Sequence, residues 1–147
     1  MVVRELLKRK PGGVISVSPS ASVQKAARLM MRHGVGGLPV VDDDGALVGF
    51  ISEREVVDAV DRSAEDVLEL RVAFLMRQPA PACRSDDGIQ QVMRRMTRDR
   101  LRHLVVVEEG RIRGVISVGD LVKQRLEELE TEAGVLRDYI AAQRARR

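Results

Sequence analysis

The chain contains an internal repeat, and this repeat constrains its fold more than any local pattern does. The stretch GFISEREVV at residues 49–57 returns in altered form as GVISVGDLV at residues 114–122. The similarity also includes the residues before each copy, with one residue lost in a turn. We therefore predict two similar units, residues 1–64 and 65–127, followed by a C-terminal helical extension, residues 128–147.

Each unit shows the same order of sequence patterns. A short helix-forming stretch, VRELLKR or VAFLMRQ, precedes an extended piece in which proline and β-branched residues disfavour a helix. The next segment, SVQKAARLMMRH or GIQQVMRRMTRD, has apolar residues spaced by three and four and predicts an amphipathic helix. Two apolar runs of strand length follow, joined by the turns DDDGA and EEGR, and a final helix closes each unit. We class the fold as α+β or α/β, with the order β-α-β-β-α in each unit.

The composition limits the classes of function. The chain of 147 residues is 44% apolar but has no Trp, one Tyr and two Phe, so we expect an aliphatic core with few stacking platforms for single-stranded nucleic acid. The 25 basic and 22 acidic residues are interspersed, which is typical of a solvated surface and not of a polyanion-binding face. Nucleic acid is therefore not an expected partner, and only the basic tail RARR favours a DNA-associated role.

The reactive side chains are few. A single cysteine, Cys83, excludes an internal disulfide and favours an intracellular protein, and no apolar run approaches the roughly 20 residues of a membrane span. We expect a cytoplasmic protein without membrane association. Two histidines, no nucleophile paired with a base, no metal-ligand spacing and no GxxxxGK[ST] motif predict that the chain is not an enzyme and binds no metal.

The repeated motif places Ser three residues before a carboxylate, as Ser52 and Glu55 in the first unit and as Ser117 and Asp120 in the second. This spacing is that of a capping box, in which Ser begins a helix and the acid three residues on caps the backbone. The capping box alone does not explain why a glycine and a strand precede both copies. A binding site used twice is the other interpretation.

The order of elements, with LPVVDDDGALVGFISEREVV and HLVVVEEGRIRGVISVGDLV, resembles two CBS domains, the modules named after cystathionine β-synthase. The tandem resembles a Bateman module of the stand-alone bacterial two-CBS type, and the resemblance covers about residues 2–126. It implies two domains packed as a pseudo-twofold pair with two clefts between them. It also implies a regulatory sensor whose clefts bind adenosine-containing ligands such as AMP, ADP, ATP, NAD(H) or S-adenosylmethionine.

The resemblance also implies roles for individual residues. The carboxylate of the motif binds the ribose hydroxyls, the Ser hydroxyl and the helix N-terminus face the phosphate, and adenine lies between the first strand and the start of the second. The candidate ligand-binding residues are Ile15, Ser16, Leu38, Pro39, Ser52, Arg54, Glu55, Pro81, Ala82, Arg102, His103, Leu104, Val105, Ser117, Gly119 and Asp120.

The two predicted sites are not equal. The second motif has Asp120, with Gly119 leaving room for a ligand, whereas the first has the longer Glu55, which puts its contact with a ribose in question. Arg54 is a candidate phosphate partner in the first site. A second difference lies ahead of the strands, where the first copy has GG and the second has Arg102 and His103. In the family, basic residues at these positions often reach phosphate across the cleft.

Some of these residues also have simpler interpretations. Arg102 is equally well explained as a solvated cation at a helix end. His103 has a side chain that titrates near neutral pH, which makes a pH switch a minor hypothesis. Cys83 is better explained as a small buried side chain than as a redox sensor.

The C-terminal segment has apolar residues at spacings of four and three, the seam of a coiled coil. These residues are Val122, Leu126, Leu129, Ala133, Leu136 and Ile140. A seam of two to three heptads interrupted by Gly134 is too short to dimerise alone, so we expect a homodimer formed through the CBS helices with this arm packed against the partner. The leading functional hypothesis is a non-catalytic adenine-nucleotide sensor that acts on a regulated protein. The alternative is a structural or protein-interaction adaptor with vestigial clefts.

Overall fold

The first sheet is an antiparallel hairpin of two strands, β1 (Gly37–Val41) and β2 (Leu47–Ser52), in which Leu38 pairs with Ile51. In the computed structural model, which describes residues 1–63 and 65–146, helix α2 (Val23–His33) and helix α3 (Glu53–Ser63) belong to the same unit. Helix α2 packs Ala26 and Met30 into the core against the sheet. In the extended piece before α2, Val17 forms an isolated parallel bridge with Val40.

The second sheet has three strands in the order β3-β4-β5. Strand β3 (Ala82–Arg84) lies parallel to β4 (His103–Glu108), which pairs antiparallel with β5 (Arg111–Ser117). Helix α5 (Ile89–Asp99) and the start of helix α6 (Val118–Ala145) enclose its core. The predicted β-α-β-β-α order is confirmed in both units, with the first strand of the first unit reduced to the Val17 bridge.

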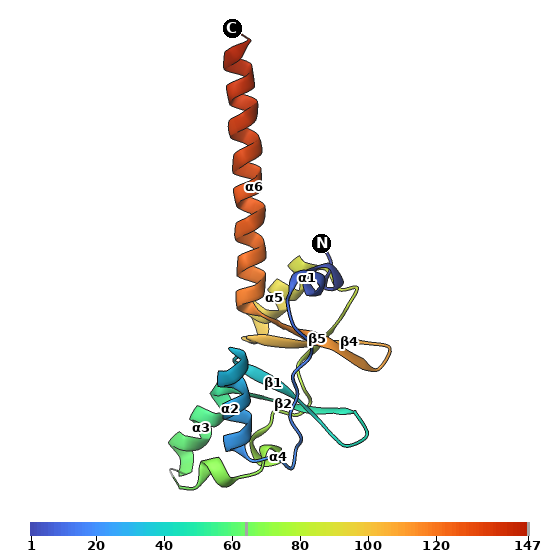
Figure 1. Cartoon of the computed structure of the whole chain (residues 1–147), viewed down its shortest axis with the longest axis vertical. Coiled ribbons are helices and arrows are strands. Elements are labelled where there is room, and N and C mark those ends of the chain that lie inside the picture. Colours follow the sequence, from blue (N-terminus) through green and yellow to red (C-terminus); the bar gives the residue numbers. More distant parts are fainter. Residues whose placement is uncertain (64, 147) are drawn as a thin grey trace.

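Each unit begins with a short helix. The leading helix of the first unit packs against the second sheet, and the leading helix of the second unit packs against the first sheet. Helix α1 (Val3–Arg9) packs Val3 and Leu6 into the core of the second sheet, and the Val3 amide donates to the carbonyl of Asp87 at 2.9 Å. Helix α4 (Val72–Leu75), which follows the 3-10 turn η1 (Val67–Glu69), packs Val72 into the core of the first sheet. Figure 1 shows the result, with blue α1 beside the yellow and orange elements and green α4 beside the blue and cyan ones. The chain therefore crosses between the two units twice.

The glycine that opens each repeated motif makes room for an exchanged helix. A Cβ atom on Gly49 would lie 2.7 Å from Sδ of Met76, the residue after α4, and 2.9 Å from the carbonyl oxygen of Arg77. A Cβ atom on Gly114 would lie 2.8 Å from Cδ2 of Leu7 in α1. The repeated glycine is thus a packing requirement of both units.

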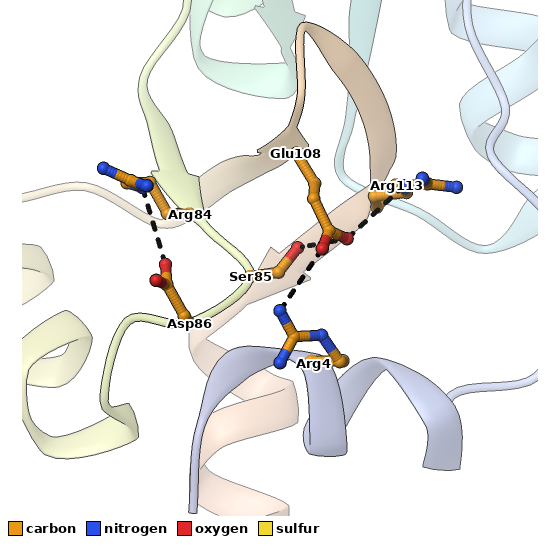
Figure 2. A network of polar contacts seen from close by, with 6 residues as sticks. All are labelled: Arg4, Arg84, Ser85, Asp86, Glu108 and Arg113. Atoms are coloured by element: carbon orange, nitrogen blue, oxygen red, sulfur yellow. Dashed lines mark hydrogen bonds and ion pairs between the residues drawn. The ribbon is translucent and has the colours of Figure 1, made fainter.

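A polar network fixes α1 to the second sheet (Figure 2). The carboxylate of Glu108, on β4, accepts hydrogen bonds from Arg4 at 3.2 Å and from the buried Ser85 hydroxyl at 3.1 Å. Arg113 lies 3.5 Å from the same carboxylate, and Arg84 pairs with Asp86 beside it. The hydrogen bond from Ser85 and the adjacent Arg4 hold the pKa of Glu108 below its usual range. A cavity of about 490 Å³ next to this network is lined by Arg4, Arg84, Ser85, Asp86 and Glu108, which are already paired with one another.

The thiol of Cys83 is buried in the core of the second unit. Burial raises its pKa to about 12, with a further contribution from Asp87. The neutral thiol is a poor nucleophile, which agrees with the interpretation of Cys83 as a small core side chain.

Helix α6 runs without a break through Gly134 and projects away from both sheets as a long arm (Figure 1). Its first turns pack against the body through Leu121 and Gln124, and the side-chain oxygen of Gln124 accepts a hydrogen bond from Arg9 at 3.0 Å. Within the described residues, no helix is both long and apolar enough to cross a membrane. The predicted helical extension is confirmed as the continuation of the helix that closes the second unit.

We expect Gly134→Ala to stabilise the arm, because glycine in a helix interior costs about 1 kcal/mol relative to alanine. A Cβ atom at Gly134 meets no heavy atom within 4 Å, so the substitution introduces no clash. Circular dichroism should show that the variant retains more helix than the parent chain as the temperature rises. Amide hydrogen exchange around residue 134 should be slower in the variant. Unchanged exchange in the arm would contradict this expectation.

Candidate functional site

Among the described residues, a cleft of about 860 Å³ is lined by both units, and it is larger than a second cleft between them. The first unit contributes the segment after α1, the end of α2 and the start of β1, including Ile15 and Leu38. The second unit contributes Val115, Ser117 and Asp120. Ile15 and Leu38 of the first unit therefore give the cleft an apolar surface, and the second unit gives it the polar motif.

The polar side of this cleft is the N-terminus of α6. The Ser117 amide donates to Oδ2 of Asp120 at 2.9 Å, and the Asp120 amide donates to Oγ of Ser117 at 3.2 Å. This is the predicted capping box. Because both side chains also line the cleft, the capping and binding interpretations of the motif are compatible at this position.

Lys10 is a cation in this cleft that sequence reasoning missed. Its Nζ donates to Oδ2 of Asp120 at 2.8 Å and to the carbonyl oxygen of Val115 at 2.7 Å. Burial by itself raises the pKa of Asp120, but the hydrogen bonds from Lys10 and Ser117 outweigh it and hold that pKa below its usual range. Asp120 is therefore an ionised, half-buried acceptor at neutral pH. The described contacts all use Oδ2, which leaves Oδ1 with acceptor capacity for a ligand.

The smaller cleft has a volume of about 460 Å³ and contains the motif of the first unit, Ser52, Arg54 and Glu55. Pro81 and Arg102 reach it from the second unit. Two further arginines that the sequence did not single out, Arg77 and Arg100, and two further acids, Glu53 and Asp99, also line it. Positive and negative side chains are thus mixed around this cleft.

The extra methylene of Glu55 changes the local hydrogen bonding. The Ser52 amide donates to Oε2 of Glu55 at 2.7 Å, and the Ser52 hydroxyl donates to the same oxygen. In the second motif the Ser117 hydroxyl instead accepts from the helix backbone. The carboxylate of Glu55 is therefore turned back onto Ser52, and the Ser52 hydroxyl proton is already used.

His103 lies where the two clefts meet and lines both of them. Its ring centroid is 5.3 Å from that of Phe50, and a Cβ atom on Gly36 would lie 3.4 Å from the imidazole. The matching position of the first unit is Gly37, where a Cβ atom would lie 2.6 Å from the Phe50 ring. Gly36 therefore leaves space for the His103 ring, and Gly37 leaves space for the Phe50 ring beside it.

His103 is neutral at pH 7. Burial lowers its pKa below the usual 6.5, and the positive charge of Lys10 lowers it further, while Glu53, Glu55 and Asp120 act in the opposite direction. The unfolded chain consequently binds a proton at this position more readily than the folded chain does.

We expect His103 to make the protein less stable in mild acid. The free energy of unfolding should fall as the pH drops through 6.5, and this loss should reach a constant value below the folded pKa of His103. Urea unfolding at pH 7.5 and pH 5.5 should show a smaller pH effect in His103→Gln than in the parent chain. An identical pH effect in both proteins would contradict the prediction.

The structure brings a subset of the candidate residues to the clefts. Ile15, Leu38, His103, Ser117 and Asp120 line the larger cleft, and Ser52, Arg54, Glu55, Pro81, Arg102 and His103 line the smaller one. The other candidates lie outside the linings of both clefts: Ser16, Pro39, Ala82, Leu104, Val105 and Gly119. Leu104 and Val105 are fully buried in β4, and Pro39 is buried in β1. His103 lines both clefts, whereas Arg102 lines only the smaller one.

Groups of three or more His, Cys, Asp or Glu side chains placed to hold a metal ion do not occur in the part of the chain that the structure describes.

Comparison with known proteins identifies the family of this fold. The family model for the CBS domain matches twice, at residues 3–62 and 64–127. The chain is 37% identical to the CBS-domain containing protein ATU1752 from Agrobacterium tumefaciens, with a TM-score of 0.81, covering 85% of this chain and 99% of that one. It is 25% identical to CBSX2, solved in complex with AMP, with a TM-score of 0.70, covering 86% of this chain and 96% of that one.

Among curated proteins, the chain is 33% identical over 135 residues to inosine-5'-monophosphate dehydrogenase from Mycobacterium tuberculosis. The match covers 87% of this chain but only 24% of the dehydrogenase. The two family-model matches account for most of the chain, and the match to the Agrobacterium structure spans 85% of this chain with the same fold. The protein belongs to the CBS domain family and consists of a tandem pair of CBS domains, a Bateman module, with a helical arm.

Proposed function

We propose that this protein is a non-catalytic regulatory module that binds an adenosine-containing ligand, such as AMP, ATP or NAD(H), in the larger cleft between its CBS domains. The observation that carries the proposal is the Asp120 carboxylate at a capped helix N-terminus, in a cleft that the apolar side chains of Ile15 and Leu38 of the other domain also line. The AMP complex of CBSX2 supports an adenosine ligand for this fold. The proposal places the module in the cytoplasm, where a buried thiol such as that of Cys83 stays reduced.

Each part of such a ligand has a counterpart in the larger cleft. An ionised carboxylate only accepts hydrogen bonds, and a ribose offers two vicinal hydroxyl donors, so Asp120 suits the ribose. Ile15, Leu38 and Val115 supply an apolar surface for the adenine ring. The N-terminus of α6 and the Ser117 hydroxyl suit a phosphate, because the first amides of a helix carry partial positive charge.

Lys10 connects the ligand-free and ligand-bound forms. Without ligand its ammonium neutralises Asp120 at 2.8 Å. A phosphate near the α6 N-terminus would attract the same ammonium, and the flexible lysine side chain has the reach to serve both anions. Lys10 would then exchange a carboxylate partner for a phosphate partner and would remain paired in both forms.

The smaller cleft is the weaker candidate for a ligand site. Glu55 accepts from both donors of Ser52, so a ribose there would have to compete with a formed intramolecular contact. Arg54 and Arg102 supply positive charge for a phosphate, but Glu53 and Asp99 line the same space. We expect binding at this cleft to be weaker than at the larger one.

Calorimetric titration tests the proposal. AMP, ATP, NADH and S-adenosylmethionine should be titrated into the protein, with ribose 5-phosphate and GMP as controls for the sugar phosphate and the base. We expect at least one adenosine compound to bind more tightly than both controls. The absence of binding by every adenosine compound at millimolar concentration would contradict the proposal.

The second candidate function is a protein-interaction adaptor with vestigial clefts. The hydrogen bonds from Ser52 to Glu55 favour it, because both polar side chains of the first motif are already paired with each other. The same titration separates the two functions. In both cases we expect a homodimer formed through the CBS helices and the arm, and a regulated protein that recognises this dimer.

A further inference from the structure

The arm carries an exposed apolar seam on the side that faces away from the body. Val122 is 49% exposed, Leu126 55% and Leu136 59%, whereas Leu121 and Gln124 on the other side of the same helix are buried. Leu129, Ala133 and Ile140 continue the seam at the same spacing of three and four residues. A sustained spacing of this kind is the sequence pattern of a two-stranded coiled coil.

The seam has a unique assignment to heptad positions. Its spacings place Leu126, Ala133 and Ile140 at position a and Val122, Leu129 and Leu136 at position d. Leucine at d is the residue that two-stranded parallel coiled coils favour there, and it occupies two of the three d positions between residues 122 and 140. Gly134 then falls at position b, outside the seam, so it does not interrupt the contact surface as the sequence had suggested.

The charged residues beside the seam distinguish the possible orientations. Between residues 122 and 140, position g is occupied by Arg125, Glu132 and Tyr139, and position e by Lys123, Glu130 and Arg137. In a parallel coiled coil, each g residue meets the e residue of the following heptad in the other helix. Arg125 then faces Glu130 of the second helix, and Glu132 faces Arg137. Each of these contacts joins opposite charges, and the twofold axis repeats each of them.

Antiparallel pairing over the same seam gives the opposite result. There e residues face e residues and g residues face g residues. With the whole seam overlapped, Glu130 would face its own equivalent in the second helix, and so would Glu132. Like charges at such positions disfavour association.

From this pattern we infer that the partner of the arm is the arm of a second copy of this chain, packed parallel and in register. The inference rests on the proposed homodimer and goes beyond it by stating direction and register. The contact places the two bodies at the same end of a two-helix rod. The seam is short, so the association draws on the body as well as on the arm.

A cysteine at the far end of the arm tests the orientation. Gln143 is exposed and occupies position d, where identical residues of parallel helices face each other. Gln143→Cys should form a disulfide-linked dimer within minutes of mild oxidation in dilute solution without nucleotide. Ala141→Cys, at the outward position b, is the matched control and should not form this disulfide-linked dimer. The native Cys83 is buried and adds no background cross-linking.

A charge reversal tests the register independently. Among the described residues, neither Glu132 nor Arg137 has an ion-pair partner in its own chain, whereas Arg125 pairs with Glu128 at 3.2 Å. Glu132→Lys should raise the dissociation constant of the dimer about tenfold, because two attractive contacts become repulsive. It leaves the isolated helix no weaker, since the new lysine would follow Glu128 by four residues. Adding Arg137→Glu should restore the parent value.

Sedimentation and non-reducing electrophoresis give the outcomes. The inference is supported if the dimer cross-links in Gln143→Cys but not in Ala141→Cys. It also requires that Glu132→Lys weakens the dimer and that adding Arg137→Glu restores it. A dimer that does not cross-link at 143 overturns the orientation and leaves the proposed dimer standing, and a monomer overturns both. Since no nucleotide is present, none of these results depends on ligand binding.

Discussion

Replacing Asp120 by alanine is expected to weaken binding of an adenosine ligand at least about a hundredfold. The carboxylate offers the ribose two charge-assisted hydrogen bonds, each worth about 1.5–3 kcal/mol, and about 2.7 kcal/mol corresponds to a factor of a hundred. Glu55→Ala should change the tighter binding event less than about threefold, because Glu55 lines only the smaller cleft. Calorimetry on the three proteins under identical conditions makes this comparison.

Asp120 also caps α6, so its loss costs stability as well as affinity. Removing a cap side chain costs about 1 kcal/mol. Asp120→Asn controls for this effect, since the amide keeps the size and one acceptor oxygen but loses the charge, and it should bind the ligand more weakly than the parent chain while remaining folded. Parent-like affinity in Asp120→Ala would remove Asp120 from the site and contradict the proposed ribose contact.

Gly49→Ala is expected to destabilise the protein by about 2–3 kcal/mol, near the upper end of what overpacking a core costs. The new Cβ atom would lie 2.9 Å from the backbone oxygen of Arg77, which is fixed because the Arg77 amide and carbonyl both bond to Phe50. The equivalent Gly114→Ala should cost about 1 kcal/mol, because the nearest atom is a methyl group of Leu7 that can rotate away. Urea unfolding measures both.

Gly13→Ala is the matched control for these substitutions, because a Cβ atom there would meet no heavy atom within 4 Å and the backbone at this position is not left-handed. It should change the free energy of unfolding by less than about 0.5 kcal/mol. Equal losses at Gly49 and Gly114 would show that the fixed backbone beside Gly49 is not the decisive difference between the two positions.

The repeat predicts most of the fold, because it doubles every local signal. Helix α1 has the predicted bounds Val3–Arg9, and the hairpins and amphipathic helices appear in both units. The first strand of each unit was predicted less well. In the first unit Val17 makes an isolated bridge, whereas in the second unit Ala82–Arg84 form a strand. The two copies share a pattern but not the neighbours that complete a sheet edge.

The site could be predicted only in part. The motif residues Ser117 and Asp120 follow from the sequence, since they lie at the junction of a strand and a helix in each copy. The role of Lys10 does not, because it depends on α1 packing against the second domain, and the leading helices of both copies have the same apolar pattern. Sequence alone does not determine which core each of them enters.

The exchange of α1 and α4 also determines the order in which the two cores can close during synthesis. The first core is completed when Val72 emerges, soon after its own sheet and helices. The second core needs Leu121 from α6 as well as Val3 and Leu6 from the start of the chain. Helix α1 is therefore the first helix to be synthesised and among the last to pack into its core. Until it packs, its apolar face is exposed to other newly made chains.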